Sequence, residues 1–94
     1  MDNKEALRII RAELEPFRSK PHSELVKMID GEPVIGERDG KDGKHYQFEI
    51  QAFWDDEPKS HVRVSGSIDD GGWRSFFPLT DSFIRTASNE FIDQ

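Results

Sequence analysis

The sequence contains no cysteine, and its apolar runs are only a few residues long. Without cysteine there is neither a disulfide framework nor thiol chemistry, which fits a reducing compartment. The short apolar runs argue against a membrane-spanning helix, and Met1 to Glu5 lack the apolar core of a secretion signal, which argues against secretion. We therefore expect a cytoplasmic protein with no membrane partner.

Clusters of basic residues are also absent. The chain has 13 Lys and Arg against 19 Asp and Glu, which gives a net charge of −6 at pH 7. Binding to a nucleic-acid backbone depends on clustered Lys and Arg that displace counterions. Nucleic acid is therefore not expected as a partner. The length of 94 residues suits one core, so residues 1–94 are expected to form a single domain.

What the sequence does contain is alternation of apolar and polar residues, the pattern of strands with one buried face. It runs from Tyr46 to Trp54, from Val62 to Ile68, and from Trp73 to Leu79. Hairpins closed around Asp55 to His61 and around Asp69 to Gly72 place apolar residues opposite one another. The predicted pairs are Phe48 with Ile68, Trp54 with Val62, Ile68 with Trp73, and Val62 with Leu79.

A shorter strand, Val34 to Arg38, precedes these three and is expected at the edge of the sheet. Val34 is predicted opposite Phe48, and Gly36 opposite Tyr46. The small residues Ala52, Gly66 and Ser75 then form a line across the inward face. We expect a helix to occupy this groove. An apolar ligand pocket between helix and sheet, above Gly66 and Ser75, is a weaker alternative.

The N-terminal region predicts two helices. Leu7, Ile10 and Leu14 form one apolar stripe, and Pro16 is expected to kink or stop that helix near Glu15. The second helix is expected to start with Ser19 as N-cap and Pro21 in its first turn, and to end with Gly31 as a left-handed cap.

The complete prediction is an α+β fold. Two N-terminal helices pack on a four-stranded antiparallel β-meander. The apolar pairs Phe83-Ile84 and Phe91-Ile92 indicate a short C-terminal hairpin.

On the outward face, Phe53 and Phe76 break the polar alternation. The predicted register places Arg63 opposite Phe53 and next to Ser65, which is opposite Phe76. An arginine between two aromatic rings is typical of a protein contact patch. The alternative is that Phe83-Ile84 or Phe91-Ile92 folds over these side chains and forms a second small core.

Two groups of carboxylates, Asp55-Asp56-Glu57 and Asp69-Asp70, follow successive strands. They are expected at opposite ends of a strand, roughly 20 Å apart, too far to share one ion. His61 faces Asp55 across the strand ends, which predicts a surface ion pair. Spacing places no serine or cysteine beside them. The sequence therefore predicts no catalytic residue, metal-ligand set or cofactor.

Three motifs carry a resemblance to a known family. They are Phe53 to Asp56 (FWDD), Ser67 to Arg74 (SIDDGGWR) and Phe77 to Ile84 (FPLTDSFI). The chain, from Leu14 onward, resembles a small family of uncharacterised bacterial domains. The resemblance implies a bacterial source and a helix-plus-meander fold. That family has no assigned activity, so no functional residue is carried over.

The functional hypothesis is a non-enzymatic, acidic protein-binding or adaptor module. It would use either the patch of Phe53, Arg63 and Phe76 or the Asp-rich loops at the strand ends. The candidate contact residues are Phe53, Asp55, Asp56, His61, Arg63, Asp69, Asp70 and Phe76. The alternative is a small metal-binding protein or metal-assisted hydrolase that uses one of the Asp-rich loops.

Overall fold

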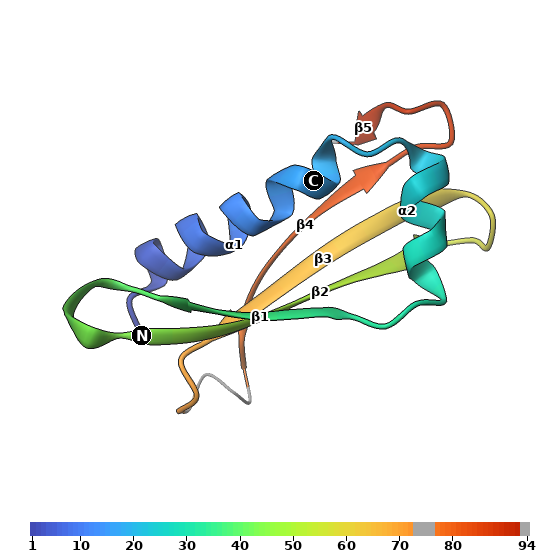
Figure 1. Cartoon of the computed structure of the whole chain (residues 1–94). Coiled ribbons are helices and arrows are strands. Elements are labelled where there is room, and N and C mark those ends of the chain that lie inside the picture. Colours follow the sequence, from blue (N-terminus) through green and yellow to red (C-terminus); the bar gives the residue numbers. More distant parts are fainter. Residues whose placement is uncertain (73–76, 93–94) are drawn as a thin grey trace.

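The structure is a computed structural model that describes residues 1–72 and 77–92. Its elements are α1 (Asn3–Arg18), α2 (His22–Ile29), β1 (Val34–Asp39), the 3-10 turn η1 (Lys41–Gly43), β2 (His45–Asp55), β3 (His61–Asp69), β4 (Leu79–Arg85) and β5 (Phe91–Ile92). The strands form one antiparallel sheet in the order β1-β2-β3-β4-β5 (Figure 1). The α+β prediction is confirmed, but the prediction of four strands is wrong, because the described sheet has five.

The central hairpin has the register that the alternation predicted. Phe48 is opposite Ile68, Ile50 opposite Gly66, and Trp54 opposite Val62. The even-numbered residues of β2 face the helices, and most of them are buried. Alternation alone therefore fixed both the pairing and the buried face of β2 and β3.

The register of β1 differs from the prediction by two residues. Val34 is opposite Ile50, and Gly36 is opposite Phe48. A Cβ atom on Gly36 would lie 2.6 Å from Cε2 of Phe48, so the aromatic ring occupies the space that a side chain would take. A side chain at position 36 would therefore collide with the Phe48 ring, which glycine avoids.

The fourth strand lies further along the chain than predicted. β4 pairs Leu79 with Ile68 and Arg85 with Val62, so the predicted pairing of Val62 with Leu79 is wrong. The predicted strand residues Trp73, Ser75 and Phe76 lie outside the described residues. α1 contacts β4 directly, since Arg11 Nε lies 3.3 Å from Asp81 Oδ2 and the Arg18 guanidinium lies 4.8 Å from the Phe83 ring centroid.

The predicted C-terminal hairpin is confirmed, and it adds the fifth strand. Ile84 pairs with Ile92, and Arg85 pairs with Phe91. β4 therefore serves both as the fourth strand of the meander and as the first arm of this hairpin.

The helix ends also differ from prediction. α1 continues through Pro16 to Arg18, while Leu14 and Phe17 remain packed in or against the core. Ser19 is the C-cap of α1, and Pro21 precedes α2 as its N-cap. The backbone of Gly31 is not left-handed. Packing of the apolar stripe thus extends α1 beyond the point where its local sequence favours an end.

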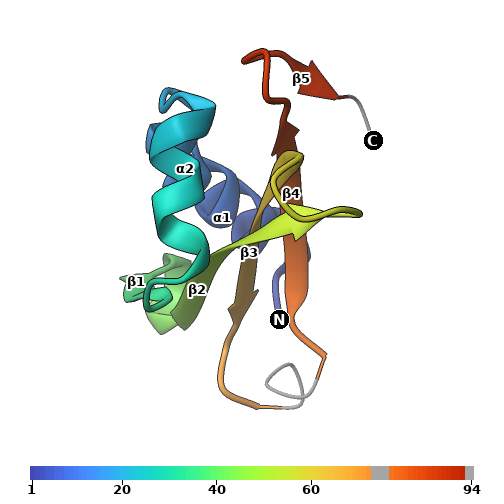
Figure 2. The ribbon, with the colours of Figure 1, turned by 90° about the vertical axis from the view of Figure 1, so that its right-hand side faces the viewer.

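α1 and α2 lie together on one side of β3 and β4 (Figure 2). A Cβ atom on Gly66 would lie 2.8 Å from both Cγ1 and Cδ1 of Ile10, which is fully buried. The predicted helix over the small residues is confirmed at Gly66. The alternative of a ligand pocket at this point is wrong, because Ile10 fills the space; Ser75 lies outside the described residues.

A buried carboxylate joins the start of α1 to the β1–β2 connection. The Tyr46 hydroxyl donates to Glu5 Oε1 at 2.8 Å, and the Lys41 amide donates to Glu5 Oε2 at 3.0 Å. The hydrogen bond from the Lys41 amide is the main cause that lowers the pKa of Glu5, and the hydrogen bond from the Tyr46 hydroxyl is the second. Burial is the main cause that raises the pKa of Tyr46 to about 12, and the hydrogen bond to Glu5 is the second. We call these three residues the Glu5 lock.

Candidate functional site

The helices leave one face of the sheet open, and this outer face contains the candidate contact residues Phe53 and Arg63. The odd-numbered side chains of β2 and β3 belong to it, because even-numbered neighbours such as Ile50 and Val64 are buried under the helices. A shallow hollow of about 150 Å³ lies along it, lined by Glu49, Gln51, Phe53, Ser65 and Ser67. The lining of this hollow is therefore mainly polar, with Phe53 as its apolar member.

Arg63 is held on this face by two neighbouring strands. Its Nε and Nη2 atoms lie 3.2 and 3.1 Å from Asp55 Oδ1 on β2, and its Nη1 donates to Ser82 Oγ on β4 at 3.0 Å. Phe53 lies directly opposite Arg63 in the register and is 46% exposed. We call Phe53, Asp55, Arg63 and Ser82 the Phe53–Arg63 patch.

The predicted ion pair between His61 and Asp55 is wrong. The two residues are opposite in the register, but the Asp55 carboxylate pairs with Arg63, two residues further along β3. A diagonal neighbour on an adjacent strand is within reach of a long side chain, and the guanidinium offers two donors to one carboxylate. Asp55 thus positions Arg63 and does not orient His61.

The predicted cover over the patch is also wrong for Phe53. Phe83 is 3% exposed and faces the helices, where it belongs to the main core. Ile84 lies on the outer face opposite Arg63, but Phe53 remains open to solvent. Phe76, the second predicted aromatic of this patch, lies outside the described residues.

The two acidic groups lie at opposite ends of β3, as predicted. Asp55 is opposite His61 at one end, and Asp69 is opposite Gln47 at the other. Asp69 accepts from the Gly71 amide at 2.8 Å, and Asp70 lies 3.7 Å from the N-terminal amine, while Asp56 is exposed. Within residues 1–72 and 77–92, no three His, Asp or Glu side chains gather in a way that suits a metal ion.

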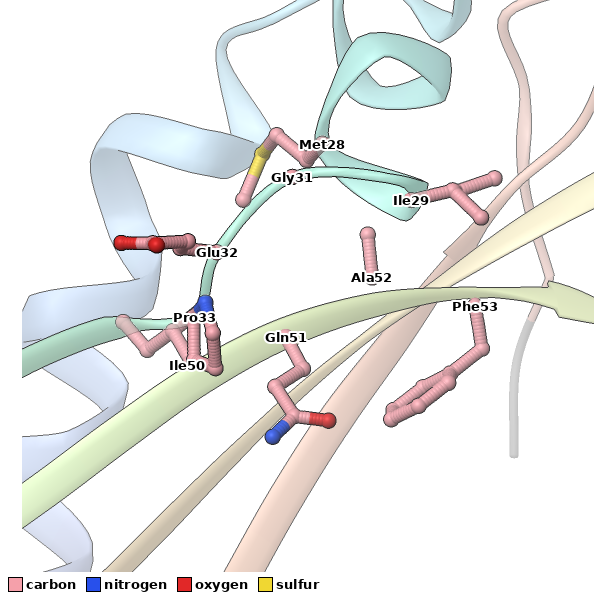
Figure 3. Close-up of a pocket in the computed structure, with 9 residues that line it drawn as sticks. All are labelled: Met28, Ile29, Gly31, Glu32, Pro33, Ile50, Gln51, Ala52 and Phe53. Atoms are coloured by element: carbon pink, nitrogen blue, oxygen red, sulfur yellow. The ribbon is translucent and has the colours of Figure 1, made fainter.

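One end of the sheet has an open edge that was not predicted from the sequence. β1 has 6 residues and β2 has 11, and the last pair between them is Val34 with Ile50. Beyond it lies a hollow of about 230 Å³, lined by Met28, Ile29, Gly31, Glu32, Pro33, Ile50, Gln51, Ala52 and Phe53 (Figure 3). The predicted strand from Tyr46 to Trp54 is longer than its predicted neighbour from Val34 to Arg38. This difference in length was the sequence signal for the overhang.

His45 lies between two carboxylates at the opposite end of β2. Its Nδ1 is 2.8 Å from Asp39 Oδ1, and its Nε2 is 3.3 Å from Glu37 Oε1. The hydrogen bond to Asp39 is the main cause that raises the pKa of His45 above its ordinary 6.5, and the hydrogen bond to Glu37 is the second. This side chain is exposed, so the group is accessible to solvent.

We expect the His45 ring resonances in NMR spectra to titrate above pH 6.5. Because the pKa is raised in the folded state, its contribution to stability is present below the unfolded pKa and is lost as pH rises through the folded value. Asp39→Asn should move the midpoint back toward 6.5, whereas Asp42→Asn on the same hairpin should leave it nearly unchanged. Equal shifts in both variants would contradict the specific contact with Asp39.

No family model, curated protein or solved structure matches this chain. The resemblance to uncharacterised bacterial domains therefore stays a prediction. Within the described ranges, no helix has the length and apolar character needed to cross a bilayer.

Proposed function

We propose that the chain is a non-enzymatic, acidic protein-binding module whose contact surface is the Phe53–Arg63 patch. The observation that carries this proposal is an exposed aromatic ring opposite an arginine fixed by neighbouring strands. Both residues project from regular strands of the sheet, and the helices pack on its other face.

The composition of the patch suits protein recognition. Aromatic and arginine side chains are enriched among the residues that contribute most to binding at protein interfaces. Arg63 is already ordered by Asp55 and Ser82. A side chain ordered before binding loses less conformational entropy when a partner arrives. The patch is therefore preorganised for contact.

The charge of the chain indicates the chemistry of the partner. The net charge is −6, and Asp56 is exposed next in sequence to the patch residue Asp55. Electrostatic complementarity increases the rate and specificity of association. We therefore expect a partner that offers an apolar side chain to Phe53 and basic residues around it.

A metal-assisted reaction has less support. The acidic loops are separated by β3, and no suitable group of three His, Asp or Glu side chains occurs in the part of the chain that the structure describes. Asp69 Oδ1 accepts a hydrogen bond from the Gly71 amide at 2.8 Å, and Asp70 Oδ1 accepts one from the Gly72 amide at 3.4 Å. Such bonds are typical of residues that stabilise turns.

The Phe53→Ser variant tests the patch. The immobilised wild-type chain is used to capture proteins from an extract of the source cells, and each captured protein is then purified and titrated. We expect Phe53→Ser to weaken binding of the specific partner by about tenfold or more, because it removes an exposed aromatic anchor.

Ile35→Ser is the matched control, because Ile35 is 71% exposed on the same face but lies opposite Glu49. The Ile35→Ser variant should bind the partner with the affinity of the wild type. Circular dichroism should show that both variants fold like the wild type. The proposal is abandoned if every titrated partner binds the two variants and the wild type equally.

A further inference from the structure

The overhang of β2 leaves part of a strand without a neighbour. On the β1 side, the pairing of β2 ends at Ile50, and β3 pairs with its other side as far as Asp55. Among the described residues, no strand therefore pairs with Gln51 to Asp55 on the open side. Alternate residues of such an edge present an N–H and a C=O to solvent, which is a template for one more strand. We call Gln51 to Asp55 the open edge.

The surroundings of the open edge favour an extended ligand. The 230 Å³ hollow lies between the end of α2 and β2. In Figure 3, Ala52 points from β2 toward the side of Ile29, while Gln51 and Phe53 point to the opposite side. An added strand would place alternate side chains in the same way, one set toward the apolar residues Met28 and Ile29 and the other toward Phe53.

Acidic residues stand at both ends of the open edge. Asp30 and Glu32 lie in the connection from α2 to β1, and Asp56 and Glu57 follow the last residue of β2. All four side chains are exposed. None of the ion pairs among the described residues includes them. Their charge complements a basic ligand and disfavours a second copy of a chain with net charge −6.

We propose that the open edge binds an extended, basic peptide segment of a partner protein, which adds a strand to β2. The inference rests on the proposed function in that the ligand is a protein. It uses the edge of the sheet and shares Phe53 and Asp55 with the Phe53–Arg63 patch. Main-chain hydrogen bonds hold the segment, an apolar side chain enters the hollow, and flanking Lys or Arg residues meet the two acidic ends.

The probe is a phage-displayed library of random peptides about twelve residues long, selected on the whole chain. A span of five residues at about 3.3 Å each is roughly 16 Å, which such a peptide covers. Enriched sequences are expected to alternate apolar and polar residues and to carry flanking Lys or Arg. No enrichment, or a consensus that is acidic or has helical spacing, overturns the inference.

Backbone methylation of the best selected peptide tests strand pairing without altering the protein. Two versions are made, each N-methylated on one of the two alternating sets of residues. One version should bind at least about tenfold more weakly, because it loses the donors that face β2, while the other keeps its affinity. Equal affinities of the two versions overturn the inference.

Protein variants locate the ligand and separate the two proposals. Glu32→Lys should weaken peptide binding by about tenfold at low salt, while Glu15→Lys, an equal charge change on an exposed position of α1, should have little effect. Equal loss in both variants overturns the placement at the edge. If peptide binding follows this pattern but Phe53→Ser leaves the captured partner bound, the edge inference stands and the patch proposal fails. If Phe53→Ser releases the captured partner while Glu32→Lys and Glu15→Lys weaken peptide binding equally, the patch proposal stands and the edge inference fails.

Discussion

Ile10→Ala is expected to lower the free energy of unfolding by about 2–5 kcal/mol, the cost of truncating a fully buried aliphatic side chain. Ile10 is 0% exposed, and its Cγ1 and Cδ1 atoms occupy the space above Gly66. Domains are typically stable by about 5–15 kcal/mol, so this loss is a large fraction of the total. Urea unfolding followed by tryptophan fluorescence measures it.

The contact between Ile10 and Gly66 predicts that substitutions at the two positions are coupled. Gly66→Ala alone places a methyl group 2.8 Å from two atoms of Ile10, and such overpacking costs about 1–3 kcal/mol. In the double variant the added methyl group enters the space that Ile10→Ala vacates. The combined loss should therefore be smaller than the sum of the single losses.

Gly31→Ala is the matched control for the glycine substitution. Its added Cβ would lie 3.5 Å from the nearest atom, the Met28 carbonyl oxygen, which is ordinary van der Waals contact. This variant should remain close to wild-type stability and show no coupling with Ile10→Ala. Strict additivity of Gly66→Ala and Ile10→Ala would contradict the position of α1 over β3.

Gly40→Val is expected to break the Glu5 lock. The backbone of Gly40 is extended, with φ −101° and ψ −167°, so valine causes no backbone strain there. Its Cβ would overlap the Glu5 carboxylate and lie 2.6 Å from Cε2 of Tyr46. The displaced carboxylate leaves the Tyr46 hydroxyl and the Lys41 amide unpaired, at a cost of about 1–3 kcal/mol for each.

Tyr46 reports this change directly, because it is the single tyrosine of the chain. Its pKa is raised to about 12 in the folded protein. Its contribution to stability is present below the unfolded pKa of about 10 and is lost as pH rises through the folded value. Tyrosinate absorbance should therefore appear at lower pH in Gly40→Val than in the wild type.

Gly31→Val is the control for this second experiment, since it adds the same side chain away from Glu5 and Tyr46. It should keep the titration midpoint of the wild type. A wild-type midpoint near 10, in protein that circular dichroism shows to be folded, would contradict the buried contact between Tyr46 and Glu5.

The candidate patch was only partly predictable. Alternation placed Phe53 opposite Arg63, because the register of β2 and β3 is fixed by matching apolar residues on the opposite face. It did not show that Asp55 binds Arg63 instead of His61, since that choice depends on the reach of side chains across the sheet. The contact of Ser82 with Arg63 was not predicted, because the predicted fourth strand ended at Leu79 and Ser82 was expected in the turn that follows it.

The sequence by itself determined which side chains of β2 and β3 face inward, because a shift of one residue would expose every apolar residue of a strand. It could not determine where β1 and β4 start pairing, since a shift of an even number of residues keeps the same faces. Only the tertiary structure decided these registers. The ring of Phe48 takes the space beside Gly36, and contacts of α1 with Asp81 and Phe83 hold β4 next to β3.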